Sequence, residues 1–358
     1  MTDTKASDTG SLPVTTIDAR KLALTNWVTK NSQEGHSPVQ LQSLGSDAGF
    51  RRYFRYQQPS RWLAVDAPPA TEDTAQFLAV AQLIRAQAIR CPQIAAADTG
   101  QGFLLVEDLG DQLFLQALTP GNADALYQRA MRNLLQLQQI PDTPLLPRYD
   151  RELLHRELGI FSEWFVQKLL RHALSNDEQQ WLDNLFVQLE DSALNQPQAF
   201  VHRDYHSRNL LLLDDGNLGV IDFQGALWGS ITYDLASLLR DCYRRWPAPQ
   251  VKKWALDYRR QAIAMDLVPA VSEQEFMRWF DWTGLQRHIK VLGIFARLAL
   301  RDEKPRYLND LPLVLRYTLE VAEQYPELAR FSDWFRQTLL PLIQQQCWYK
   351  DYTTAGDE

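Results

Sequence analysis

The pattern of apolar and polar residues divides the chain into a short strand-rich part and a long helical part. Residues 1–16 are polar, and we expect them to form a flexible tail. A short helix is predicted from about Asp18 to Lys30. Alternating and β-branched or aromatic residues then predict three strands, at 39–44, 50–56 and 62–67, with a glycine-bounded loop from Gly45 to Gly49 between the first two.

A helix is predicted after the third strand. Its apolar residues follow helical spacing: Phe77, Val80, Ala81, Ile84 and Ala88. Thr71 is the expected N-cap, because Glu72 and Asp73 then fall in the first turn, where the helix dipole favours acids. A second hairpin is expected at 94–97 and 103–106.

Helical periodicity dominates the rest of the chain. We predict long helices at 122–140, 150–172 and 176–192, and further helices almost to the end. They are interrupted once, by a strand–loop–strand segment at 199–223 with a turn at 214–217. The predicted fold is α+β in two lobes: a β-rich N-terminal lobe (17–106), a hinge (107–110) and a large helical C-terminal lobe (111–358).

Composition narrows the class of protein. The chain has 358 residues, 45% of them hydrophobic and 23% charged, with a net charge of −7, so we expect a folded globular protein. The acidic balance and the lack of a basic block argue against nucleic acid or anionic membrane as a partner. Three dispersed cysteines, no leader-like apolar segment and no run of about 18 apolar residues predict a cytoplasmic protein. We expect a monomer.

Three polar side chains set among apolar strand residues carry the candidate chemistry: Asp204, Asn209 and Asp222. Phosphoryl transfer needs a carboxylate that orients the attacking hydroxyl, and an amide with a second carboxylate that hold Mg²⁺. The spacing H-R-D-x-x-x-x-N, followed one hairpin later by D-F-x, is the arrangement of protein-kinase-like sites.

Two other interpretations of this segment are weaker. The first is that the acidic residues only form a solvated turn. Asp204 and Asp222 have apolar neighbours in sequence, however, so a bare carboxylate there would be costly, whereas Mg²⁺ would supply a partner. A transition-metal site built from His202, His206 and Asp222 is disfavoured, because oxygen ligands and an amide suit Mg²⁺ better. Only 12 positions separate Asp222 from Asp234, which leaves no room for an activation loop and favours a small-molecule substrate.

The residues around these motifs resemble a known family. The D-x-H-x-x-N segment and the stretch from Ile221 to Ala236 are similar to the aminoglycoside phosphotransferase and choline kinase superfamily. Within it, several segments resemble bacterial N-acetylmuramate/N-acetylglucosamine anomeric kinases: SDAGFRRYFR (46–55), VDAPP (65–69), HRDYHSRNL (202–210), IDFQ (221–224), TYDLASLLRDCY (232–243) and GLQRHIKVLGIFARLALRD (284–302). The resemblance implies a two-lobed protein-kinase-like fold, with ATP and Mg²⁺ as cofactors.

The resemblance also implies roles for particular residues. Asp204 would accept the proton of the substrate hydroxyl, and Asn209 and Asp222 would be the Mg²⁺ ligands. The backbone of Glu107, Asp108 and Leu109 would bind the adenine edge, and Gly45 and Gly49 are further candidates for nucleotide binding. His202 and Asp234 would support the catalytic loop, Asp234 by accepting backbone N–H bonds. His206 would shape the same loop or contact the substrate.

A lysine is missing where kinase-like folds use one. The third strand normally carries a lysine for the nucleotide phosphates, paired with a glutamate of the next helix. This chain has 28 arginines but 9 lysines, with none between Lys30 and Lys168, and Asp66 occupies the expected place. Our hypothesis is that Arg51 or Arg52 supplies the cation, with one of them held by Asp66 or Glu72. Strand alternation points the two arginines to opposite faces, and it favours Arg51 if Phe50 and Phe54, which share a face with Arg52, pack on the core.

The acceptor is the least constrained part of the prediction. The resemblance implies phosphorylation of the C1 hydroxyl of N-acetylmuramate or N-acetylglucosamine in cell-wall sugar recycling. N-acetylmuramate carries a carboxylate, for which we consider four cationic candidates: Arg208, Arg287, His288 and Lys290. An aminoglycoside or other small alcohol stays open as acceptor, with an acidic cleft from Glu157, Glu163 and Asp241. A nucleotide-binding pseudokinase with a regulatory role is the alternative of another class.

Overall fold

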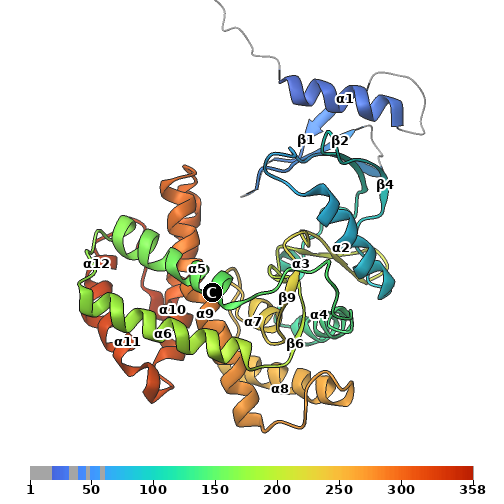
Figure 1. Ribbon diagram of the computed structural model, residues 1–358. Helices are drawn as coiled ribbons and strands as arrows, with labels where there is room; N and C mark the ends of the chain where they lie inside the picture. Colours follow the sequence, from blue (N-terminus) through green and yellow to red (C-terminus); the bar gives the residue numbers. More distant parts are fainter. Residues whose placement is uncertain (1–17, 32–38, 46–48, 57–60, 358) are drawn as a thin grey trace, which may run out of the picture. The chain divides into compact units, whose positions relative to one another are not determined.

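The computed structural model describes residues 18–31, 39–45, 49–56 and 61–357 (Figure 1). The tail predicted at 1–16 lies outside the described residues. By its internal contacts the chain divides into two compact units, one formed by Met1–Thr74 with Ile94–Asp108, the other by Ala75–Gln93 with Leu109–Glu358. The division between Asp108 and Leu109 falls inside the segment that we predicted as a hinge.

The first unit is an antiparallel sheet with one helix. Its elements are α1 (Ala19–Asn31), β1 (Leu41–Ser43), β2 (Arg52–Tyr56), β3 (Trp62–Asp66), β4 (Ile94–Asp98) and β5 (Phe103–Glu107). The strands lie in the order β1-β2-β3-β5-β4, with every neighbouring pair antiparallel. Leu24 and Val28 of α1 pack with Phe54 and Phe103 of the sheet in a shared core. The hairpins and the first helix are therefore as the hydrophobic pattern predicted.

Helix α2 (Thr74–Ala86) differs from its prediction in two ways. It begins at Thr74 rather than after Thr71, and it ends before Ala88, which is exposed and has a left-handed backbone (φ +56°). It also belongs to the second unit, although we placed it in the first lobe. The reason is its packing, because the ring of Phe77 stacks on Phe223 with centroids 4.8 Å apart.

The second unit is mainly helical. Its helices are α3 (Phe114–Ala117), α4 (Ala123–Leu137), α5 (Arg151–Ile160), α6 (Asn176–Leu194), α7 (Tyr233–Leu239), α8 (Ala248–Ala264), α9 (Glu273–Leu300), α10 (Leu311–Ala322), α11 (Ala329–Trp334) and α12 (Leu340–Ile343). Short 3₁₀ segments lie at Pro305–Asp310, Pro326–Leu328 and Tyr352–Thr354, and π-helical ones at Phe161–Leu169 and Phe335–Leu339. None of the described helices is both long and apolar enough to cross a membrane.

Helix α9 is the centre of this unit, and α5, α6, α7 and α10 contact it (Figure 1). Gly293 allows its closest approach, because a Cβ there would lie 2.5 Å from the carbonyl carbon of Ile160. That contact occurs where α5 gives way to the π-helical segment, so the helix predicted at 150–172 changes its hydrogen-bond pattern at Ile160.

Two small antiparallel ribbons carry the loops of the second unit. Strands β7 (Leu210–Leu212) and β8 (Leu218–Val220) form the predicted hairpin. Strands β6 (Gln198–Val201) and β9 (Leu227–Ser230) pair with each other, and we did not predict β9. Its sequence, Leu-Trp-Gly-Ser, is too short to show alternation, so its pairing with the distant β6 defines it.

Candidate active site

The loop between β6 and β7 contains the H-R-D-x-x-x-x-N motif, and α7 fixes its start. The buried carboxylate of Asp234 accepts hydrogen bonds from the backbone N–H groups of His202 (2.5 Å) and Arg203 (3.0 Å). The His202 ring contacts the carbonyl oxygen of Ile221 at 3.0 Å and so ties this loop to the segment that carries Asp222. These are the contacts expected of loop-supporting residues, while the role itself stays a prediction.

Asp204 follows a strained residue and lies partly exposed at the end of this turn. Arg203 has φ +81°, a conformation that non-glycine residues rarely adopt and that often marks a functional site. Burial raises the pKa of Asp204, but the charges of His206, Lys290, Arg203 and Arg287 outweigh it and hold that pKa below its ordinary value. Asp204 is therefore an ionised carboxylate at neutral pH, a weak base suited to orienting a hydroxyl.

Asn209 and Asp222 come together beside Asp204. The Asn209 amide nitrogen donates to the Asp204 carbonyl oxygen (3.0 Å) and lies 3.5 Å from a carboxylate oxygen of Asp222. Gln224 donates to the other Asp222 oxygen (2.7 Å), and Asp222 has φ +62°. Asp222 is exposed, so the apolar surroundings that we inferred for it from sequence are wrong, although Ile221 before it is half-buried and Phe223 after it is fully buried.

This pair suits a magnesium ion. It offers carboxylate and amide oxygens, and no group of three or more metal-binding side chains occurs anywhere in the described residues. Mg²⁺ keeps several waters and is usually held by one or two carboxylates plus substrate phosphates, rather than by a cage of protein ligands. Two protein ligands with an exposed Asp222 therefore fit Mg²⁺ and would not satisfy zinc.

A buried ionic cluster supports the loop from the other side. Glu157 of α5 forms ion pairs with Arg203 and with Lys290 of α9 (2.9 Å to Lys290 Nζ), and it accepts a hydrogen bond from Tyr149. Lys290 also donates to the Tyr233 hydroxyl at 3.1 Å. Lys290 is thus occupied by protein groups. We did not anticipate this cluster, although charged residues at 157 and 290 on apolar helices were a signal for it.

Of the other three acceptor candidates, the structure leaves Arg208 and Arg287 in place and removes His288. The Arg208 guanidinium lies 3.6 Å from the centre of the Tyr243 ring, against which His206 also packs. Arg287 is buried, makes no ion pair within the described residues, and contacts the Cys242 sulfur at 3.7 Å. His288 has no exposed surface, contacts the Arg240 carbonyl oxygen (3.1 Å) and stacks on Tyr317, so we remove it from the acceptor candidates.

The acidic cleft expected for an aminoglycoside is not formed by the residues that we named for it. Glu157 is buried between two cations. Asp241 is fully buried and accepts hydrogen bonds from the backbone N–H groups of Ser207 (2.8 Å) and Tyr243 (2.9 Å). Glu163 is exposed and pairs with Lys168. Glu157 and Asp241 are therefore buried and bound within the protein, and Glu163 lies at the surface in an ion pair.

In the first unit, both candidate arginines have acidic partners. Arg51 is buried and lies 2.9 Å from a carboxylate oxygen of Glu72. Arg52 pairs with Asp18 and, together with Arg20, with the buried carboxylate of Asp66. Of the aromatic neighbours that we used to orient these side chains, Phe54 is buried in the core but Phe50 is exposed.

The remaining nucleotide candidates lie in two places: beside the loop between β1 and β2, and at the end of β5. Gly45 has φ +91°, and Gly49 lies near the Glu72 carboxylate, whereas positions 46–48 of their loop are outside the described residues. Glu107 ends β5, and the Asp108 side chain pairs with Arg55. The Asp108 N–H donates to the Arg61 carbonyl oxygen (2.9 Å), so this amide of the predicted hinge is already used within the sheet.

Comparison with known proteins assigns the family. A model of the phosphotransferase enzyme family, whose name is abbreviated APH, matches residues 40–280. The chain belongs to this family. The match includes the β-strands of the first unit from β1 onward, the catalytic loop, Asp222 and Asp234, so the superfamily that the motifs predicted is confirmed.

Curated relatives cover most of the chain. It is 42% identical over 297 residues to an N-acetylmuramate/N-acetylglucosamine kinase of Pseudomonas aeruginosa, which is 83% of this chain and 88% of that protein. It is 40% identical over 316 residues to a protein of the same name from Neisseria meningitidis, covering 87% and 93% of the two chains. Similarity to the branch that we named from sequence is therefore confirmed.

Solved structures confirm the predicted two-part, protein-kinase-like fold. An ethanolamine kinase from Plasmodium vivax superposes with a TM-score of 0.60 at 12% identity, covering 87% of this chain and 89% of that one. An ADP-bound aminoglycoside phosphotransferase gives 0.58 at 14% identity, covering 85% and 99%. At these identities the likeness concerns the fold alone.

Proposed function

We propose that this protein transfers the terminal phosphoryl group of ATP to the C1 hydroxyl of N-acetylmuramate or N-acetylglucosamine, in the cytoplasmic recycling of cell-wall sugars. The observation that carries this proposal is the convergence of Asp204, Asn209 and Asp222, joined by hydrogen bonds and short distances, in a chain whose relatives are named for these two sugars.

Each of these residues would have a separate task. Asp204, an ionised and weakly basic carboxylate, would accept a hydrogen bond from the attacking hydroxyl and align it. An anomeric hydroxyl is more acidic than an ordinary alcohol, so it needs orientation more than a strong base. Asn209 and Asp222 would hold Mg²⁺, which when bound neutralises charge on the phosphates. Arg287, buried and without an ion pair in the described chain, would add positive charge beside Asp204.

In the first unit, we assign the phosphate-binding cation to Arg51. Its contact with Glu72 is a cation–glutamate pair comparable to the one that kinase-like folds form between the third strand and the next helix, although Arg51 directly precedes β2 and Glu72 lies before α2. Arg52 is less suited, because Asp18 and Asp66 already hold its guanidinium. The Leu109 side chain lies close to Gly219 of β8, which supports an apolar surface for the adenine ring near this residue.

The alternatives are less well supported. An aminoglycoside acceptor would need acidic side chains, and the three that we considered are paired or bonded to backbone. A pseudokinase has no reason to keep a strained Asp222 beside Asn209 and an ionised Asp204. The intact polar set therefore favours an active enzyme.

A panel of acceptors tests this function. We expect Mg²⁺-dependent release of ADP from ATP with N-acetylmuramate and N-acetylglucosamine, and none above background with kanamycin or choline. Asp204→Asn should lower kcat by about 10³-fold or more while nucleotide binding is retained, because positioning and charge supply most of the rate. ATP binding without turnover on any acceptor would instead indicate the pseudokinase.

A further inference from the structure

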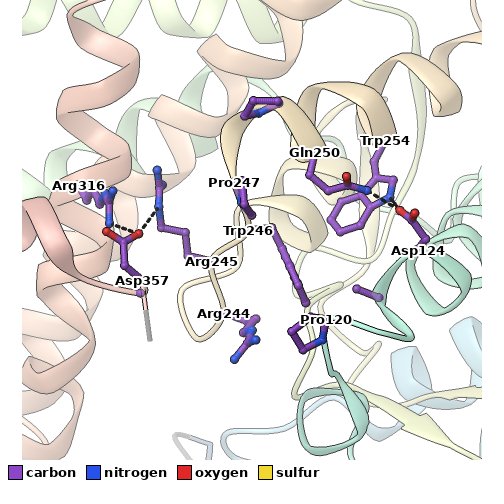
Figure 2. A pocket seen from close by; sticks show the side chains of 13 residues that line it. Pro120, Asp124, Arg244, Arg245, Trp246, Pro247, Gln250, Trp254, Arg316 and Asp357 are labelled. Carbon is purple, nitrogen blue, oxygen red and sulfur yellow. Dashed lines mark hydrogen bonds and ion pairs between the residues drawn. The ribbon is translucent and has the colours of Figure 1, made fainter.

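A cavity of about 680 Å³ opens in the second unit between the start of α4, the start of α8 and the end of the described chain. This volume lies within the roughly 300–1,000 Å³ range of small-molecule sites. Trp246 and three arginines are among its lining residues (Figure 2). It is thus large enough for a sugar, and its lining combines these three arginines with the carboxylates of Asp124 and Asp357.

The three arginines differ in whether a carboxylate holds them. Arg245 pairs with Glu320 (2.8 Å), and Arg316 pairs with Asp357 (2.7 Å). Arg244 makes no ion pair in the described part of the chain, and its buried Nε has no hydrogen-bond partner there. Figure 2 shows it beside Trp246, over whose ring its guanidinium lies 4.8 Å from the centroid. The Asp357 carboxylate of the same chain, which also lines the cavity, lies between Arg316 and Arg245 (Figure 2).

The segment that carries Arg244 begins against the catalytic loop. Asp241 binds the backbone of Ser207, and the Tyr243 ring packs on His206 and Arg208 of the same loop. Arg244 is therefore one residue beyond a direct contact with the loop that holds Asp204.

We infer that Arg244 binds the carboxylate of the acidic acceptor sugar and so separates N-acetylmuramate from N-acetylglucosamine. The inference rests on the proposed function and extends it to specificity. The two sugars differ by the lactyl ether at C3, which carries a carboxylate and is separated from the C1 carbon by C2 alone. A guanidinium offers a fixed fork of donors that matches a carboxylate, and Trp246 limits its motion.

Steady-state kinetics on both sugars test this assignment. In Arg244→Gln we expect kcat/KM for N-acetylmuramate to fall about 10- to 100-fold, the usual cost of one charge-assisted hydrogen-bond pair, with less than a twofold change for N-acetylglucosamine. N-acetylmuramate with its carboxyl group amidated should show the same loss in the wild type and no further loss in Arg244→Gln. Arg156→Gln, which removes an exposed arginine of α5, is the matched control.

The outcomes separate this inference from the proposed function. Equal losses on both sugars, or none on either, would overturn the role of Arg244 while the enzyme remains a sugar kinase. A selective loss in Arg287→Gln or Arg208→Gln, with Arg244→Gln unchanged, would also overturn it. Failure of the wild type to phosphorylate either sugar would contradict the proposed function itself.

Discussion

Asp66 in the first unit and Glu157 in the second are both buried carboxylates held between two cationic side chains, yet their surroundings differ. Asp66 binds Arg20 and Arg52, which are 39% and 33% exposed, and it ties α1 to the end of β3. Glu157 binds Arg203 and the buried Lys290, and both of these cations act on Asp204. The same ionic motif therefore fastens a helix in one unit and supports a catalytic loop in the other.

Removing the charge of either carboxylate should have the largest effects, and these effects should differ between the two units. Glu157→Gln leaves a buried lysine and a largely buried arginine without their counter-charge, so we expect the free energy of unfolding to fall by about 3 kcal/mol or more. We also expect kcat to fall about 10-fold, since the orientation of Arg203 and the field at Asp204 both change. Chemical denaturation and steady-state kinetics measure the two effects.

Asp66→Asn is the matched variant in the first unit. It should lower stability by about 1–3 kcal/mol, because two arginines lose a charge-assisted partner. The kcat should stay within about twofold of the wild type, because the proposed function gives Asp66, Arg20 and Arg52 no contact with the nucleotide or the acceptor. A larger loss of kcat in Asp66→Asn than in Glu157→Gln would contradict the distinction between the two clusters.

A smaller effect concerns acid stability of the second unit. Burial lowers the pKa of His202 to about 4 and that of His288 to about 3, whereas both are near 6.5 when unfolded. The unfolded chain therefore binds more protons below pH 6.5, and stability falls as the pH drops. Each histidine should cost about 2 kcal/mol between pH 7.5 and pH 5.

Unfolding curves at these two pH values check the effect, with His288→Gln as the informative variant. It removes one of the two titrating groups and is outside the proposed acceptor site. The stability difference between pH 7.5 and pH 5 should shrink by about 2 kcal/mol in this variant. An unchanged difference would show that His288 is not buried in its neutral form.

The sequence was sufficient for the elements whose signals are local. The strands of the first unit and the long helices follow directly from alternation and helical spacing, and the motif around Asp204 identified the superfamily. Contacts between elements that are distant in the chain could not be predicted from the sequence. Strand β9 exists because β6 lies beside it, and α2 joins the second unit because Phe77 meets Phe223. Neither partner is near in sequence.

The candidate site shows the same limit. Motif spacing brought together Asp204, Asn209 and Asp222, but the exposure of Asp222 depends on its left-handed backbone, which no neighbouring residue type reveals. Lys290 and His288 were equally plausible acceptor contacts in sequence. Glu157 lies against one and Tyr317 against the other, and only tertiary packing determines this.

The position of the new phosphate tests the central claim most directly. After reaction of [1-¹³C]N-acetylglucosamine with ATP and Mg²⁺, the C1 resonance of the product should be split by coupling to ³¹P, and the sugar should no longer reduce. Both changes follow if Asp204 orients the anomeric hydroxyl. A product that still reduces, with coupling at C6 and none at C1, would contradict the account.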